Sequence, residues 1–387
     1  PDTWEPTYLP PPVKRALQIR QSVNSSSVKK LGRLQQCVSI DGRARNALQY
    51  HGTLPGRNAG RLWQPQNFPR GTIESKDPDV LVNTIMSEDI ETIEMLFGPP
   101  IETVASSLRH ALVAEKGHVF LSGDYAGIQA RVVLALSGQW NKLELMANGQ
   151  DVYCDMASQI FKRPITKADK DERQYGKNSV LGLGFGMGAK KFHGKYCEGQ
   201  PLDFAETIVG VYRKEWAPEV PKLWRALMTA STMAVHTRKE QEAYGLRYRI
   251  EDAWLTCTFP GGSKIYYYNP VPTRESMPWD ESDVRPGWTF NATKMGKWLP
   301  IKAFGGLLTE NAVMHIEREI MVNGMLTLET NGFPVVLDVH DEILCEVPEC
   351  RADLKAFTQI MEQSPDWVKQ YRVPLKSDPW LGSRYRK

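Results

Sequence analysis

The sequence has few cysteines and histidines for its length, and they are scattered. Its 387 residues include six cysteines and seven histidines. No two cysteines form a Cys-x-x-Cys pair and no two histidines form His-x-x-x-His, so the common zinc motifs are absent. A chain of this size can also build its core without disulfides. We therefore expect neither a structural zinc site nor a disulfide framework, and a reducing, intracellular compartment.

Long apolar runs are also absent. No stretch approaches the roughly 18 apolar residues of a membrane span, so we expect no membrane partner. Apolar residues make up 41% and charged residues 24% of the chain, which excludes wholesale disorder. Residues 1–12 are Pro-rich and polar, unlike a signal peptide. The chain does not begin with Met, so we expect a fragment of a longer protein, with two or three domains of roughly 150 residues.

Positive charge is concentrated in two zones, although the net charge is only +3. Residues 1–70 hold eleven Lys/Arg and three Asp/Glu, and residues 162–195 hold nine Lys/Arg and three Asp/Glu. Basic zones on a nearly neutral chain suit a polyanionic ligand such as nucleic acid. Two solvated charged surfaces are the alternative at this stage.

The hydrophobic patterns predict an α+β fold, in which a sheet-containing domain carries a helical insertion. We expect a loop or short-strand region at 41–70 and a hairpin around residues 259–262. The other expected elements are a helix at 14–36 interrupted at Ser25–Ser27, a strand at 118–122 followed by a helix, mostly helices at 151–245, a helix at 307–330, and strands at 335–339 and 343–347.

Acidic residues follow two of the predicted strands. Asp124 lies where a buried strand gives way to a helix, and Asp341 and Glu342 lie between two apolar strands. Each of them alone is a common turn former or helix cap. Carboxylates on the ends of neighbouring strands, however, could hold two divalent cations, and oxygen ligands select Mg²⁺. A pair of such ions stabilises the attacking and leaving oxygens in phosphoryl transfer.

Two further segments carry candidate phosphate and base ligands. Arg173 and Lys177 are four residues apart on one helical face, where they could grip a triphosphate, or simply face solvent. The glycine-rich run at 182–188 follows a helix rather than a strand, which argues against a dinucleotide-binding loop. Residues 56–70 are rich in Arg, Gln and Asn, which suit phosphates and minor-groove base edges.

These segments occur in an order that resembles the family A DNA polymerases, the DNA polymerase I family. Residues 122–131 resemble motif A, residues 173–186 resemble motif B, and residues 339–342 resemble motif C. Residues 56–70 resemble the segment that contacts the primer–template duplex, in a form most similar to bacteriophage-type members. The resemblance covers about residues 28–350. It implies template-directed DNA synthesis in DNA replication.

The resemblance assigns a role to each matching residue. Asp124 and Asp341 would hold two Mg²⁺ ions, with Mn²⁺ as a substitute and the Tyr125 carbonyl assisting. Arg173 and Lys177 would bind the incoming dNTP, and Lys177 could give a proton to the leaving pyrophosphate. The remaining assignments are Leu181, Gln129 and Phe185 in the nucleotide pocket, and Arg57, Gln66, Asn67, Arg70, His340, Glu342 and Asn311 along the primer–template DNA, with Glu342 also supporting the metal site.

Four positions depart from the family pattern. Gln129 stands where the family usually has Glu, which shields the sugar 2′ position. Leu181 replaces Phe or Tyr, Phe185 replaces Tyr, and Tyr153 replaces a His that helps to bind phosphate. Both metal-binding aspartates are present, so the departures concern nucleotide selectivity rather than the reaction itself.

The resemblance also implies a right-hand fold with an antiparallel-sheet palm, helical fingers and only a remnant of the thumb. We expect the palm at 41–137 and 250–387, the fingers at 138–249 and the end of the thumb at 1–40. No room remains for a proofreading 3′–5′ exonuclease domain, so an upstream exonuclease domain or a processivity factor would be an additional partner. If the protein is phage-encoded, it would work in the cytoplasm of the bacterial host.

Two other functions stay open at this point. A single-subunit RNA polymerase shares the fold, although Glu342 after Asp341 and the segment at 66–69 favour the DNA enzyme. A nucleic-acid-binding protein without catalysis is the other alternative.

Overall fold

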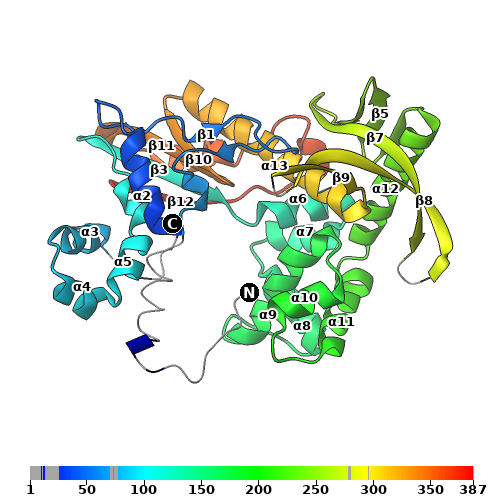
Figure 1. The fold of residues 1–387 in the computed structure, drawn as a ribbon, viewed down its shortest axis with the longest axis horizontal. Helices are drawn as coiled ribbons and strands as arrows, with labels where there is room; N and C mark the ends of the chain where they lie inside the picture. Colours follow the sequence, from blue (N-terminus) through cyan, green and yellow to red (C-terminus); the bar gives the residue numbers. More distant parts are fainter. Residues whose placement is uncertain are drawn as a thin grey trace.

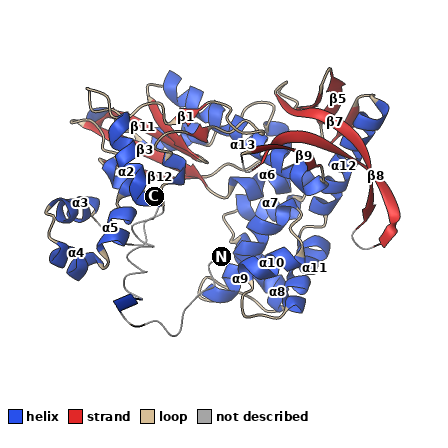
Figure 2. Ribbon diagram, in the orientation of Figure 1, coloured by secondary structure: helices blue, strands red, loops and turns tan. Residues whose placement is uncertain are grey.

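The computed structural model describes residues 10, 12–13, 26–69, 73, 77–277, 280–294 and 296–386. One half of the molecule is built around a sheet of four strands, and the other half is built from helices with a second, curved sheet (Figure 1). Helix α13 (Gly305–Thr330) runs between the two halves. Most strands belong to these two sheets, a third sheet has only two short strands, and helices pack around them, as Figure 2 shows, so the predicted α+β class is confirmed.

The N-terminal part combines short strands with short helices. Helix α2 (Ser26–Cys37) confirms the second half of the predicted helix, and Ser26 and Ser27, which were expected to interrupt it, are part of the helix. Residues 14–25 lie outside the described residues. The short-strand region at 41–70 is confirmed, and 78–111 is helical. The elements here are β1 (Leu48–Gln49), β2 (Ala59–Gly60), η1 (Pro65–Asn67), α3 (Pro78–Met86), α4 (Ile90–Phe97), α5 (Pro100–Ser106) and η2 (Leu108–Ala111).

The four-stranded sheet is antiparallel throughout, in the order β10-β11-β3-β12. Its strands are β3 (His118–Tyr125), β10 (Val335–Val339), β11 (Glu342–Pro348) and β12 (Ser377–Gly382). All three predicted strands are confirmed, although β3 continues beyond Ser122 to Tyr125. Alternate side chains of β3 enter different cores: Leu121 lies in the main core, and Phe120 lies in a smaller core with Trp63.

The second half begins with helices, as predicted for 151–245. Asp151 caps the first of the predicted helices by accepting hydrogen bonds from Tyr153 N and Cys154 N. The predicted breaks at Pro164 and at 182–188 both fall between α-helices. The elements are α6 (Ile128–Ser137), α7 (Trp140–Ala147), α8 (Val152–Phe161), α9 (Lys170–Gly182), η3 (Leu183–Phe185), α10 (Ala189–Tyr196), α11 (Leu202–Val211), η4 (Tyr212–Trp216) and α12 (Glu219–Thr237).

A six-stranded antiparallel meander follows these helices. The predicted hairpin at 259–262 is confirmed, since Thr258 pairs with Lys264. The other four strands were not predicted, because Pro286, Gly287 and several charges obscure the alternation in the longest of them. The strands are β4 (Gln241–Ala243), β5 (Leu246–Glu251), β6 (Trp254–Thr258), β7 (Lys264–Met277), β8 (Asp280–Lys294) and β9 (Lys297–Lys302).

Helix α13 confirms the helix predicted at 307–330, and its buried face packs against both halves of the molecule. Among the described residues, none of the helices has the length and apolar character that crossing a bilayer requires. The remaining elements are η5 (Glu349–Arg351), α14 (Leu354–Met361) and η6 (Lys369–Tyr371).

Helices α8 and α9 approach closely at Gly176. A Cβ atom at this position would stand 2.1 Å from the carbonyl oxygen of Tyr153 and 3.0 Å from the amide nitrogen of Ala157. Both atoms belong to the backbone of α8, so neither can rotate away. The position therefore requires glycine.

Replacing Gly176 with alanine should lower the free energy of unfolding by about 1–3 kcal/mol, because α8 and α9 must separate to admit the methyl group. Gly194→Ala in α10 is the matched control, since no described atom lies within 4 Å of its Cβ position. Alanine there should raise stability by up to about 1 kcal/mol through helix propensity. Chemical denaturation measures both changes. Unchanged stability of the Gly176 variant would contradict the close helix contact.

Candidate active site

Asp124 and Asp341 lie at the same end of the four-stranded sheet. The register places Asp124, near the end of β3, opposite Glu342, the first residue of β11. Asp341 directly precedes Glu342, and its carbonyl oxygen accepts a hydrogen bond of 3.0 Å from Tyr125 N. Strand pairing thus brings together two acids that are far apart in the sequence, as their positions at strand ends predicted.

The turn that carries Asp341 is held by the segment at 64–67. His340 adopts a left-handed backbone with φ of 60°, and its Nε2 lies 2.9 Å from the carbonyl oxygen of Gln66. Next to Gln66, Asn67 is exposed and donates from Nδ2 to Gln64 Oε1 at 3.0 Å. The predicted DNA ligands Gln66, Asn67 and His340 therefore lie beside the turn of Asp341. Arg70, which was predicted with them, lies outside the described residues.

Glu342 is buried beneath this turn, with only 1% of the residue exposed. Ser122 Oγ donates to its Oε1 at 2.6 Å, and Tyr385 Oη donates to its Oε2 at 2.7 Å. Burial and the negative charge of Glu342 raise the pKa of the Tyr385 phenol, which therefore remains a donor. A carboxylate held in this way ties β11 to β3 and supports Asp341 from beneath, rather than presenting a surface to a duplex.

A buried acid that sequence reasoning missed connects three of the predicted residues. Glu317 of α13 is 2% exposed and forms an ion pair with Arg57. Burial raises the pKa of the Glu317 carboxyl, and the nearby charge of Asp124 raises it further. Arg57 and Gln129 act in the opposite direction and lower this pKa. Glu317 therefore holds Arg57 and lies close to both Gln129 and Asp124.

The sequence contained one signal for Glu317. It is an acid at an inward position of α13, between the fully buried Val313 and Ile320. A charged group in such a position is costly to bury unless it has a partner. Its partner is 260 residues away in the sequence, so local patterns could not name it.

The basic residues of α9 are positioned from α8. Arg173 pairs with Asp151 through an N–O distance of 2.8 Å, and its guanidinium lies 5.3 Å from the ring centre of Tyr153. Burial alone would lower the pKa of Arg173, but hydrogen bonds to Asp151 and its charge raise the pKa above the usual value. Asp151 therefore has two functions, as the N-cap of α8 and as the counter-charge of Arg173. The sequence analysis did not identify it.

Tyr153 connects this pair to the end of β3. Its hydroxyl lies 3.8 Å from the Cβ position of Gly127, which is three residues after Asp124. The structure thus places the basic helix next to the loop that follows the first aspartate. Lys177 lies one turn beyond Arg173 on α9 and is partly exposed, so both cations belong to the same helical face.

Two residues predicted for the nucleotide pocket lie at or just after the C-terminal end of α9, and one predicted DNA ligand is buried in the fold. Leu181 is 41% exposed at the C-terminal end of α9, whereas Phe185 is partly buried against the main core. Asn311 is 6% exposed, and its Nδ2 donates to the hydroxyl of Tyr267 at 3.2 Å. Its amide therefore supports the packing of α13 on the second sheet, which differs from the expected duplex contact.

The acids fit a hard cation that receives part of its coordination from elsewhere. Within the described residues, no group of three or more His, Cys, Asp and Glu side chains could by itself hold a metal ion. Mg²⁺ usually binds through one or two carboxylates and takes water and substrate phosphates for the rest. Asp124, Asp341 and the Tyr125 carbonyl match this donor set.

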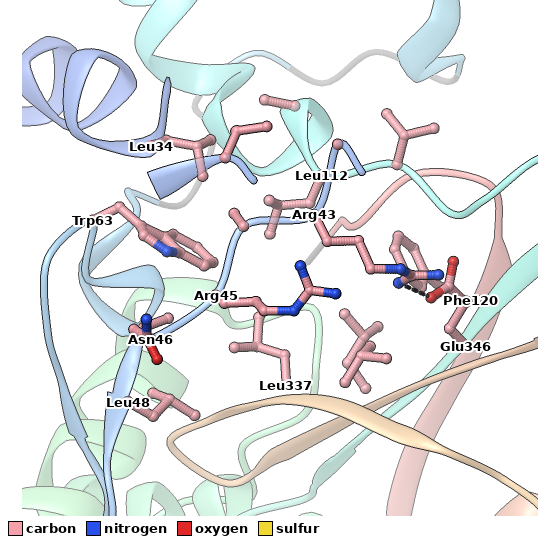
Figure 3. Close-up of a pocket in the computed structure, with 18 residues that line it drawn as sticks. Leu34, Arg43, Arg45, Asn46, Leu48, Trp63, Leu112, Phe120, Leu337 and Glu346 are labelled. Carbon is pink, nitrogen blue, oxygen red and sulfur yellow. Dashed lines mark hydrogen bonds and ion pairs between the residues drawn. The ribbon is translucent and has the colours of Figure 1, made fainter. Parts of the chain in front are cut away.

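The cavity shown in Figure 3 is separate from these residues. It measures about 790 Å³ and lies beside the smaller core, between α2, the loop at 42–48 and the four-stranded sheet. Arg43 spans it and forms an ion pair with Glu346 at 2.6 Å. None of the predicted site residues within the described part of the chain lines this cavity, so it is not the place where the predicted chemistry would occur.

Comparison with known proteins supports the resemblance. The model of the family "DNA polymerase family A" matches residues 71–237. A DNA polymerase of Bacillus phage SP02 is 31% identical over 382 residues, covering 97% of this chain and 57% of that protein. The thermostable DNA polymerase I of Thermus aquaticus is 24% identical over 285 residues, covering 73% of this chain and 29% of that protein.

A structural comparison adds the fold. The polymerase domain of Pol1 from M. smegmatis, solved in complex with DNA primer-template and dNTP, aligns with a TM-score of 0.59 at 16% identity. The alignment covers 93% of this chain and 51% of that one. The chain thus spans little more than half of the phage relative and a smaller share of the bacterial one. The family model and the phage relative agree with the family inferred from the motifs, and the structural neighbour agrees with its fold: this chain is similar to the family A DNA polymerases.

Proposed function

We propose that this chain is a DNA-directed DNA polymerase, which adds dNTPs to a primer 3′-hydroxyl on a DNA template. One observation carries the proposal. Asp124 and Asp341 lie together at one end of the four-stranded sheet, and Tyr153 lies between that end and Arg173 on the basic helix. Paired carboxylates beside a triphosphate-binding helix are what nucleotidyl transfer requires. The names of the relatives agree with this function.

The division of the chain follows from the same proposal. Residues 41–137 and 250–387 would form the palm, residues 138–249 the fingers, and residues 1–40 the end of the thumb. The four-stranded sheet would then be the floor of the palm, and α9 the finger helix that faces the nucleotide. Gln66, Asn67, His340 and Arg57 would border the primer–template duplex.

Each side chain of the proposed site has a distinct task. Two Mg²⁺ ions bound by Asp124, Asp341 and the Tyr125 carbonyl would stabilise the charge that develops during attack on the α-phosphate. Arg173 would orient the triphosphate with its forked donors. Lys177 would hold the leaving pyrophosphate and supply a proton to it, because an ammonium can give up a proton more readily than a guanidinium.

Gln129 would control access to the sugar. It is partly buried, and its amide is near enough to Glu317 to lower the pKa of that carboxyl. Its side chain has nearly the volume of glutamate, so it can act as a steric block at the 2′ position even though it lacks the charge. Leu181 would provide an apolar surface next to the incoming nucleotide, without a hydroxyl to replace a missing 3′-OH.

Primer extension with Mg²⁺ and dNTPs tests the proposal directly. The wild-type chain should extend a primer, and Asp124→Ala and Asp341→Ala should each reduce the rate at least about 100-fold. Both variants should retain duplex binding, because each acid positions a metal ion rather than DNA. Gel-based extension measures the rate, and fluorescence anisotropy of a labelled duplex measures binding.

Asp378→Ala is the matched control for this experiment. Asp378 is exposed on β12, directly opposite Asp124 in the register, so its removal deletes a neighbouring carboxylate outside the proposed metal ligands. This variant should extend primers at close to the wild-type rate. If the wild-type chain binds the duplex but does not extend the primer, the protein is a nucleic-acid-binding protein and not a polymerase. Extension with rNTPs alone would indicate an RNA polymerase.

The two cations of α9 should differ in kinetic effect. Lys177→Ala should lower the maximal rate by about 100-fold or more, because it removes the proton donor. Arg173→Ala should mainly raise the apparent nucleotide KM, because Arg173 orients the triphosphate. Pre-steady-state incorporation of a single nucleotide separates the two parameters. Identical profiles for the two variants would rule out this division of roles.

The sugar pocket should prefer dNTP strongly over both rNTP and ddNTP. Gln129→Ala should weaken discrimination against rNTP about tenfold, because the steric block is removed. Leu181→Tyr should admit ddNTP, since it adds the hydroxyl that leucine lacks. Competitive incorporation opposite one template base measures each ratio. Similar entry of ddNTP and dNTP into the wild-type chain would contradict the role given to Leu181.

A further inference from the structure

The six-stranded sheet has one face that packs on helices and one that faces away from them. On the inner face, Trp288 Nε1 donates to Ser231 of α12 at 3.1 Å, and Tyr267 accepts a hydrogen bond from Asn311 of α13. The strand pairing sets Tyr268 opposite Trp254, and Thr293 opposite Trp298, on the other side of the sheet. We call the side that bears Trp254, Tyr266, Tyr268 and Trp298 the outer face.

The outer face carries aromatic rings where a solvated sheet normally carries polar groups. Trp298 is 57% exposed, Tyr266 46%, Trp254 38% and Tyr268 36%. The rings form a continuous row. Trp254 lies 6.0 Å from Tyr266 and 4.8 Å from Tyr268, which in turn lies 5.9 Å from Trp298, measured between ring centres.

Cations flank this row. The register of β5, β6 and β7 aligns Arg249 with Thr256 and Tyr266, and aligns Arg247 with Thr258 and Lys264. Both arginines are exposed, and Lys302 of β9 lies opposite Thr289, on the same side of the sheet as Asn291. The acids on this side are Glu242, opposite Arg247, and Glu251, which pairs with Lys264 at 2.9 Å. Further along β8 the same side carries Arg285 and Asp283, which pair with each other at 2.7 Å. Around the four rings, the described side chains thus supply four cations and two anions, so this part of the face is positive.

We propose that the outer face binds single-stranded DNA. Exposed aromatic rings stack on unpaired bases whatever their sequence, and flanking cations neutralise the phosphates. A duplex hides its base faces and could use only the cations, so the row of rings favours a single strand over double-stranded DNA. Tryptophan, tyrosine and arginine are also enriched at protein interfaces, so the feature that favours a nucleic acid is the pair Lys264 and Lys302, because lysine is depleted in such interfaces. The face lies on other elements than the proposed active site, and the inference does not depend on polymerase activity.

Binding of a fluorescent oligothymidylate of about 12 nucleotides, followed by anisotropy without Mg²⁺ or dNTP, tests this inference. Trp298→Ala and Tyr268→Ala should each weaken binding about fivefold or more. Trp298→Phe should retain most of the affinity, because it keeps a ring. Replacing Arg247 and Arg249 together by alanine should reduce the salt dependence of binding, because fewer counterions are released.

Trp140→Ala is the matched control, since Trp140 is a 44% exposed tryptophan on α7, away from this sheet. It should bind the oligonucleotide like the wild-type chain. Equal affinity of the Trp298→Ala, Tyr268→Ala and Trp140→Ala variants would overturn the inference. Primer extension by the wild-type chain is measured separately. If the wild-type chain fails to extend primers while the two outer-face variants still bind the oligonucleotide more weakly, the polymerase proposal is wrong and this inference stands.

Discussion

The pairing of β3 with β11 is the interaction on which the proposed site depends. It sets Asp124 opposite Glu342 and brings the Asp341 carbonyl to the amide of Tyr125. Glu342, buried between Ser122 and Tyr385, fastens this edge because a buried carboxylate must keep its hydrogen-bond donors. A shift of one residue in this register would reverse the faces of the acids and destroy the site.

The cations of the proposed site are held by acids outside its motifs. Glu317 orients Arg57, and Asp151 orients Arg173. An ion pair of this kind costs desolvation, so it adds little net stability, but it restricts a long side chain to one direction. Preorganised charges are more effective in catalysis than mobile ones, because the protein needs no rearrangement during the reaction. The supporting acids therefore contribute to the geometry without touching a substrate.

The two sheets have different relations to the helices around them. The four-stranded sheet is covered on both faces, by the main core and by the smaller core. The residues of the proposed site therefore lie at one end of its central strands. The six-stranded sheet is covered on one face only, by α12 and α13. Its other face is free to carry aromatic and basic side chains without disturbing a core. Helix α13 contributes to both regions through Glu317 and Asn311.

Local sequence determined the elements and the motifs of this protein. Continuous apolar runs located β3, β10 and β11, because these strands are buried, and a helical pattern located α13, because one of its faces packs on the core. Only the tertiary structure decided the partners of Arg57 and Arg173, the burial of Glu342, and the common face of the four aromatic rings. Ion pairs and sheet faces join residues distant in the chain, and their energies depend on burial, which a local pattern does not contain.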